Sequence, residues 1–175
     1  MTFLRAALSV ALVVTALLLE LVALPLLHLP GAVPDLLTVT VVAIGFVGGP
    51  VRGAATGFMA GLLLDLVPPA DGVLGMSAVV LVVVGYFAGL VASNGEHSAF
   101  VVVGQTGLLA GAGTLALALL GGLVADPRIT WDRVPLLVLT EFAYALVLAA
   151  FVVPAVSALW RRIDPPAPRY EVGRQ

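Results

Sequence analysis

The chain contains no cysteine and no lysine, and only 10% of its 175 residues are charged. Without cysteine, a disulfide framework and a thiolate metal site are both excluded. A soluble domain typically carries about 25% charged residues. This chain has too few charges to cover itself with a polar surface, so we exclude a soluble globular domain.

Basic residues are also too few for a nucleic-acid-binding protein. All eight are arginines, ten acidic residues outnumber them, and the net charge is −2. They form no basic stripe along the chain, which is the usual electrostatic signature of a nucleic-acid-binding surface. We therefore expect no nucleic-acid partner.

Apolar residues, in contrast, are in large excess. They make up 61% of the sequence, and the mean hydropathy is +1.17. Six apolar runs predict an all-α integral membrane protein, a bundle of six transmembrane helices spanning residues 4–29, 36–49, 53–67, 73–92, 99–125 and 134–160. Six spans of ~20 residues would use most of the chain. We expect residues 161–175, rich in proline and charge, to form a mobile cytoplasmic tail.

Two features of these runs need interpretation. The first run is far longer than the 7–15 apolar residues of a signal peptide, so we interpret it as a retained span. The second and third runs are only about 21–22 Å long as helices, shorter than a ~30 Å hydrocarbon core. They either thin the bilayer locally or are partly shielded by protein.

Loop arginines predict the orientation. Six fall on the side of both termini and two on the other: Arg5, Arg52, Arg161, Arg162, Arg169 and Arg174 against Arg128 and Arg133. The positive-inside rule then places both termini in the cytoplasm. Trp131 and Trp160 fall at the ends of spans, where aromatic anchors are expected.

Catalytic and metal-binding motifs are missing from the sequence. The two histidines, His28 and His97, fall on opposite predicted sides and cannot share a metal. There is no H-E-x-x-H motif, no phosphate-binding glycine loop and no G-x-S-x-G, since Gly75–Val79 fails at its last position. We therefore expect a protein that is not an enzyme and needs no cofactor or metal.

Glycines recur at helical spacing in the third run. Gly53, Gly57 and Gly61 lie on one helix face, with Asp65 next in the series. Such small residues let two transmembrane helices approach closely. Similar series follow in the fourth and fifth runs, at Gly85 and Gly89 and at Gly104, Gly107 and Gly111. The glycines either pack the chain's own bundle or dock a partner helix.

Four acids fall in the outer half of the predicted bundle, with no arginine at that depth. Glu20 and Glu141 lie roughly 10–14 Å below the outer edge, and Asp35 and Asp65 lie near that edge. Acids inside a membrane are costly and usually functional. They form a polar clasp between the first and sixth spans, line a small-molecule cavity, or contact a partner.

The segment from residue 34 to residue 89 carries several of these residues in a recurring order. Pro34-Asp35 opens the second span, and Gly48-Gly49-Pro50-Val51-Arg52-Gly53 separates the second from the third. Gly57-Phe58-x-x-Gly61-Leu62-x-x-Asp65 closes the third span, and Leu74-Gly75 and Gly85-Tyr86-x-x-Gly89 follow. This pattern resembles the rod shape-determining protein MreD family of the bacterial inner membrane.

The resemblance implies a non-enzymatic scaffold of the cell-elongation machinery. Family members accompany the bitopic protein MreC and link MreB filaments to the peptidoglycan synthase RodA and its transpeptidase, and a homodimer is compatible with this role. The family is also similar in fold to the substrate-binding subunits of energy-coupling-factor transporters, which supplies an alternative function. The matching residues carry no catalytic role. The resemblance implies helix packing or partner contacts for one group, namely Gly53, Gly57, Phe58, Gly61, Gly85, Tyr86 and Gly89. It implies polar contacts for a second group, Pro34, Asp35, Arg52 and Asp65, and Gly75 also matches the pattern.

Overall fold

The computed structural model describes residues 2–24, 26, 34–67, 73–93, 98–126 and 129–163, and these contain helices but no strand. The helices are α1 (Thr2–Val22), α2 (Leu36–Gly48), α3 (Pro50–Leu66), α4 (Met76–Ser93), α5 (Ala99–Leu123) and α6 (Val134–Ile163). The expected all-α class is confirmed. By length and composition, α1, α4, α5 and α6 are long and apolar enough to cross a membrane; α2 is a shorter apolar helix, and α3 is not among the candidate spans.

Several helix ends differ from the hydropathy runs for local reasons. α3 begins at Pro50 rather than at residue 53, because proline suits the first helical position, whose N–H needs no partner. α4 begins only at Met76, after Gly75 at a φ of +92°. α1 ends at Val22, and α6 continues to Ile163, past the expected start of the tail. Residues 164–175 lie outside the described residues.

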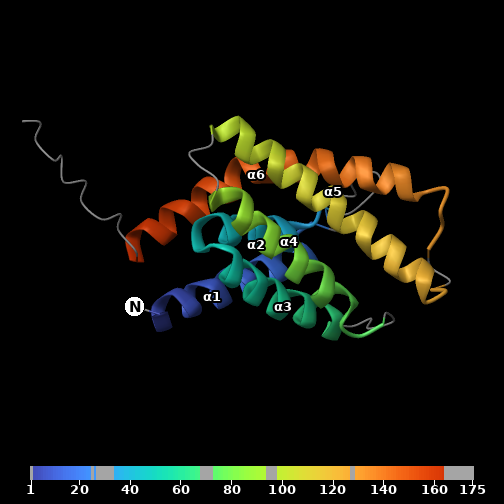
Figure 1. Ribbon diagram of the computed structural model, residues 1–175, viewed down its shortest axis with the longest axis horizontal. Helices are drawn as coiled ribbons and strands as arrows, with labels where there is room; N and C mark the ends of the chain where they lie inside the picture. Colours follow the sequence, from blue (N-terminus) through green and yellow to red (C-terminus); the bar gives the residue numbers. More distant parts are fainter. Residues whose placement is uncertain are drawn as a thin grey trace, which may run out of the picture.

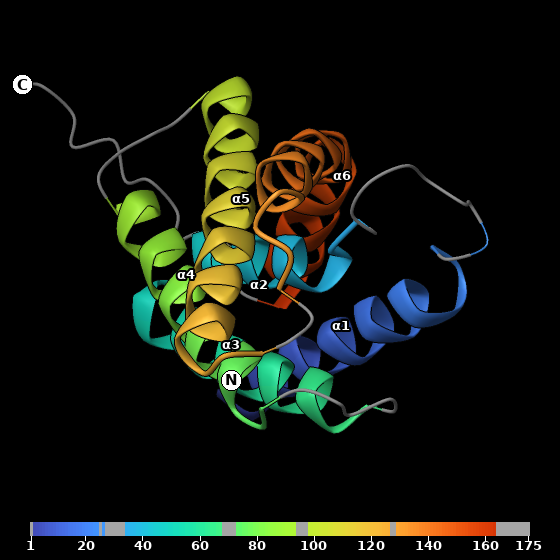
Figure 2. The same ribbon diagram turned by 90° about the vertical axis from the view of Figure 1, so that its right-hand side faces the viewer.

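α2 lies at the centre of the bundle, and the other five helices all contact it. Every residue from Leu37 to Gly45 is buried. A helix that is apolar on all sides suits such a position. Figures 1 and 2 show α2 surrounded by the longer helices. Of the two readings of its short length, shielding by protein is therefore the one that the structure shows.

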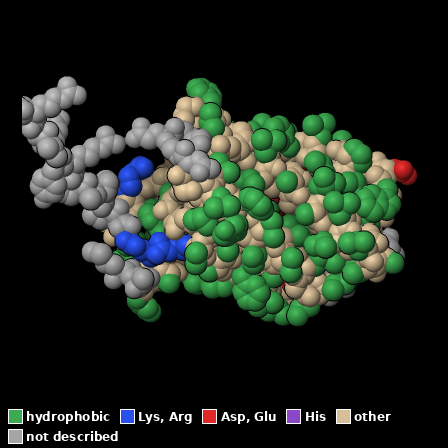
Figure 3. All heavy atoms as spheres, viewed as in Figure 1, with side chains coloured by type: hydrophobic (Ala, Val, Ile, Leu, Met, Phe, Trp, Pro, Cys, Tyr) green, Lys and Arg blue, Asp and Glu red, His purple; other side chains and the backbone are tan. Residues whose placement is uncertain are grey.

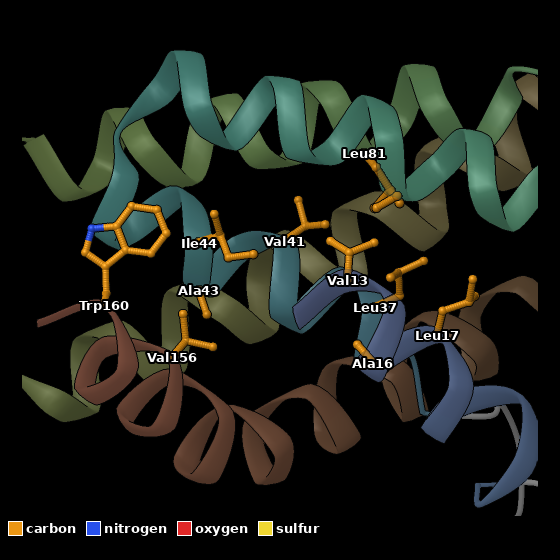
Figure 4. Packing of buried hydrophobic residues seen from close by; sticks show 11 residues of the cluster. Val13, Ala16, Leu17, Leu37, Val41, Ala43, Ile44, Leu81, Val156 and Trp160 are labelled. Atoms are coloured by element: carbon orange, nitrogen blue, oxygen red, sulfur yellow. The ribbon is translucent and has the colours of Figure 1, made fainter. Parts of the chain in front are cut away.

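The main core forms around α2. Figure 4 shows buried side chains from several helices converging there, among them Val13 of α1, Ile44 of α2, Leu81 of α4 and Val156 of α6. Lipid tails are as apolar as these side chains, so in a membrane close packing stabilises such a core more than removal from water does.

The remaining helices form two hairpins. α3 packs mainly on α4, and α5 packs mainly on α6. Among the described residues, α3 makes no close backbone contact with α5 or α6. The two hairpins separate at α6: where α3 and α5 finish and α4 and α6 begin, α5 stays beside α4 but α6 lies away from α3 and α4 (Figures 1 and 2).

The arginines of the described residues lie at the two ends of the molecule. In Figure 3 hydrophobic side chains cover most of the visible surface, and basic side chains gather at the end where α1 begins and α6 finishes. Arg5 lies near the start of α1, Arg161 and Arg162 lie in the last turn of α6, and Arg52 of α3 lies beside Trp160 of α6. Arg133 lies at the opposite end, before the first residue of α6.

Candidate functional site

The N-terminus of α2 is capped by its own sequence. Asp35 is the N-cap residue, and its Oδ1 accepts a hydrogen bond from the Thr38 backbone N–H at 2.6 Å. Its Oδ2 accepts a second bond from the Thr38 hydroxyl. An aspartate in this position satisfies backbone N–H groups that have no partner inside the helix. Asp35 therefore fixes where the central helix begins.

Two further acids reach the same helix end from outside. Glu20 of α1 accepts the Leu37 backbone N–H with its Oε2 at 2.8 Å. Glu141 of α6 accepts the Asp35 backbone N–H with its Oε2 at 3.3 Å. Backbone N–H groups and the helix dipole both favour negative groups at this position. The three acids thus tie α1 and α6 to the N-terminus of α2.

Of the roles open to these acids, this arrangement is a polar clasp between the first and sixth helices. The clasp is indirect, because each glutamate binds α2 rather than the other glutamate. Glu141 is only 2% exposed, and its Oε1 is buried without a hydrogen-bond partner among the described residues. Within the same part of the chain, no group of three or more acids, histidines or cysteines is arranged to hold a metal ion.

The glycine face of α3 lies directly against α4. A Cβ atom at Gly57 would collide with the Leu81 carbonyl, and one at Gly61 with the backbone of Ala78. Gly53 and Gly85 meet backbone to backbone in the same way, and Gly89 meets the backbone at Pro50. The strip therefore packs the chain's own helices. Docking of a partner helix on this strip is excluded in this fold, because α4 already covers it.

Gly45 of α2 belongs to the same contact, although the sequence interpretation missed it. A Cβ atom there would lie 2.8 Å from the Gly85 carbonyl oxygen. α2, α3 and α4 thus meet at three glycines. In the sequence, the sign of the Gly45 contact was a single glycine inside the second apolar run.

Asp65 acts apart from the other three acids. Its Oδ2 accepts the Gly75 backbone N–H at 2.7 Å, which closes the turn between α3 and α4. Gly75 directly precedes α4 and has a positive φ. Asp65 therefore binds the turn before α4, whereas Glu20, Asp35 and Glu141 meet at the N-terminus of α2.

The remaining residues singled out in the sequence differ from one another in their surroundings. Phe58 and Tyr86 are 53% and 42% exposed, and so point away from the helix contacts. The Arg52 guanidinium lies 5.4 Å from the centre of the Trp160 ring. Trp160 is buried in the core rather than exposed at an interface, so the expectation of an aromatic anchor is wrong there. Trp131 is 53% exposed.

A cleft occupies the space where the two hairpins diverge. Its volume is about 560 Å³, and residues of α3, α4, α5 and α6 line it. Asp65 is the one residue of the four acids on its wall; Asp126, Thr130 and Arg133 are further polar residues there. The sequence interpretation did not identify this cleft, because it depends on how far the hairpins separate.

A second hollow lies on the outer side of the α5–α6 hairpin. Its lining is almost entirely apolar and includes Leu108, Gly111 and Phe142. Nearby on α5, a Cβ atom at Gly104 would meet nothing within 4 Å. The chain's own packing thus does not require a glycine at this position, unlike at Gly57 or Gly61.

No protein-family model, no curated protein and no solved structure matches the chain. The fold and the contacts above therefore stand on the structure itself. The resemblance to the MreD family rests on the motif residues, and its functional content is a proposal.

Proposed function

We propose that the protein is a non-enzymatic membrane scaffold of the bacterial cell-elongation machinery. In this role it lies in the inner membrane with both termini in the cytoplasm, and α2 and α3 complete a set of six membrane helices. It binds a bitopic partner of the MreC type and, through it or directly, wall synthases of the RodA and transpeptidase classes and MreB filaments.

The observation that carries the proposal is what the motif residues do. Asp35 caps α2, Asp65 binds the Gly75 N–H just before α4, and Gly53, Gly57 and Gly85 allow α3 and α4 to touch. Every one of these roles builds a rigid helix bundle. A motif devoted to packing and capping suits a protein that presents surfaces to partners better than one that performs a reaction.

The position of the arginines supports the proposed orientation. Arg5, Arg52, Arg161 and Arg162 lie at one end of the bundle, with Arg133 at the other. Basic residues next to membrane helices favour the cytoplasmic side. That end would then face MreB filaments, and the end with the cleft would face outward.

The outer face of α5 and α6 is the surface we assign to a partner helix. The glycine faces of α3 and α4 are already occupied by each other. The α5–α6 hollow, in contrast, is apolar and open, and Gly104 beside it has room for a neighbour. Small residues at such a surface allow close helix association in lipid. A second copy of the chain could use the same face.

Affinity purification from native membranes tests the proposal. Tagged chain is extracted in mild detergent, and bound proteins are identified by mass spectrometry. Recovery of a single-span protein with a coiled-coil extracellular part, together with wall synthases, is the expected result. A chain that is folded but recovers none of these proteins would contradict the scaffold role.

The alternative function, a substrate-binding membrane subunit of a vitamin or metabolite transporter, is favoured by the cleft. Its volume of about 560 Å³ lies within the 300–1,000 Å³ typical of small-molecule sites. Recovery of an ATPase pair with a transmembrane coupling subunit in the same purification would support this alternative. Stabilisation of the purified chain by a metabolite in a thermal-shift screen would support it independently.

A further inference from the structure

We propose that the cleft between the two hairpins binds one zwitterionic phospholipid with a primary amine, as in phosphatidylethanolamine. One acyl chain fills the apolar depth of the cleft, and the head group lies among the charged residues at its mouth. This inference goes beyond the scaffold function and does not depend on it.

Much of the cleft wall is apolar. Leu117, Ala118 and Leu137 lie on its wall within α5 and α6. A water molecule needs two to four polar partners to occupy a cavity, so apolar walls do not hold ordered water well. In a bilayer, the molecule at hand to fill such a space is a lipid chain. The cleft volume of about 560 Å³ is that of a site for a ligand-sized group.

The mouth of the cleft offers groups of both signs. Arg133 is exposed and forms no ion pair with any described residue. Asp65 uses its Oδ2 for the Gly75 N–H, which leaves Oδ1 without a hydrogen-bond partner among the described residues. Arg133 suits a phosphate, because guanidinium groups bind phosphate oxygens well. The Asp65 carboxylate suits an ammonium group.

The helix ends at the cleft also favour a ligand that carries both a phosphate and an ammonium group. α4 begins at Met76 and α6 begins at Val134, and both residues line the cleft. α3 ends just after Leu64 and α5 ends just after Gly121, which also line it. Helix N-termini favour a phosphate and helix C-termini favour a cation. A head group with both charges therefore matches the site better than a purely anionic one.

Three lipids with the same acyl chains distinguish this proposal from general lipid binding. Phosphatidylglycerol lacks a cation for Asp65, and the quaternary ammonium of phosphatidylcholine has no N–H to donate. The purified full chain, stripped of phospholipid in detergent, is mixed with each lipid and analysed by native mass spectrometry. We expect one phosphatidylethanolamine per chain, retained at least tenfold more than either other lipid. Equal retention of all three would overturn the proposal.

Matched arginine variants locate the site. Arg133→Gln should lower phosphatidylethanolamine retention at least tenfold, whereas Arg161→Gln, at the opposite end of the bundle, should leave it unchanged. Retention that is unaffected by Arg133→Gln would overturn the assignment to this cleft. Neither arginine is buried, so both variants should fold, and thermal unfolding in detergent checks this.

Two further experiments test whether an acyl chain of the lipid fills the cleft. Val73 lies at the cleft and is 50% exposed, so Val73→Trp should obstruct the cleft without disturbing the core. We expect this variant to lose the lipid while unfolding at the same temperature as the parent. Free phosphoethanolamine should not displace the lipid. Displacement of the lipid by free phosphoethanolamine would show that the acyl chain does not bind in the cleft. That result would contradict the acyl-chain part of the proposal.

Discussion

The Oε2 of Glu141 in α6 accepts a hydrogen bond from the backbone N–H of Asp35 at 3.3 Å, across 106 positions of sequence. The bond joins the last helix to the start of the central one. Glu20 makes the equivalent bond from α1 to Leu37. A short helix in the middle of a membrane bundle has N–H groups that neither water nor lipid can satisfy. The two glutamates supply the missing acceptors.

Loss of the Glu141 carboxylate should destabilise the bundle. Glu141→Leu leaves the buried Asp35 N–H without an acceptor, which costs about 1–3 kcal/mol. Glu141→Gln keeps an oxygen at the same place and should cost less. Thermal unfolding of the purified variants in detergent measures the difference. A Leu variant as stable as the Gln variant would show that this hydrogen bond contributes nothing.

Glycines 57 and 104 should respond in opposite ways to the same change. Gly57→Ala forces a Cβ against the Leu81 carbonyl, and overpacking of this kind costs about 1–3 kcal/mol. Gly104→Ala meets nothing and should leave stability equal or slightly raised, because alanine is the better helix former. Unfolding temperatures of the two variants test the contact between α3 and α4. Equal effects would contradict the packing described here.

Removal of the Asp65 side chain should loosen the turn between α3 and α4. Asp65→Ala leaves the Gly75 N–H without its acceptor, and loss of a comparable helix cap costs about 1 kcal/mol. Hydrogen exchange at the start of α4 should rise in this variant and stay close to the parent in Asp65→Asn, which keeps an acceptor oxygen. Unchanged exchange in the Ala variant would argue against a capping role.

The absence of natural cysteine allows a direct test of orientation. Single cysteines are introduced at the exposed Asp132, between α5 and α6, and at the exposed Arg162, near the end of α6. A membrane-impermeant maleimide applied to intact spheroplasts should label the cysteine at 132 and not the one at 162. Permeabilised cells should show both. Labelling of position 162 from outside would reverse the proposed orientation.

Hydropathy and glycine spacing predicted much of the fold. They located all six helices, and the series through Gly53, Gly57 and Gly61 anticipated a close helix contact. Two pieces of local chemistry remained hidden. Asp35 and Thr38 form an N-cap, a role that the position of Asp35 just before the second predicted span did not reveal. Gly75 likewise delays the start of α4, because its positive φ does not continue a helix.

The parts of the candidate sites that the sequence did not predict depend on tertiary arrangement. Depth estimates placed Glu20 and Glu141 at one level, but did not predict that both bind N–H groups at the same helix end. Each glutamate binds a backbone N–H group. Every residue except proline has such a group, so the residue types in the sequence do not indicate which one is bound. The cleft near Arg133 depends on the separation of two hairpins whose individual sequences are simply apolar.

Site-specific photocrosslinking tests the central claim, that a membrane partner binds the outer face of α5 and α6. A photoreactive amino acid is placed at Leu108 in the α5–α6 hollow or, as a matched control, at Phe58 on α3; these side chains are 64% and 53% exposed. We expect position 108 to yield an adduct with a single-span coiled-coil protein and position 58 to yield none. An adduct with a transporter coupling subunit, or protein adducts at position 58 alone, would contradict the account.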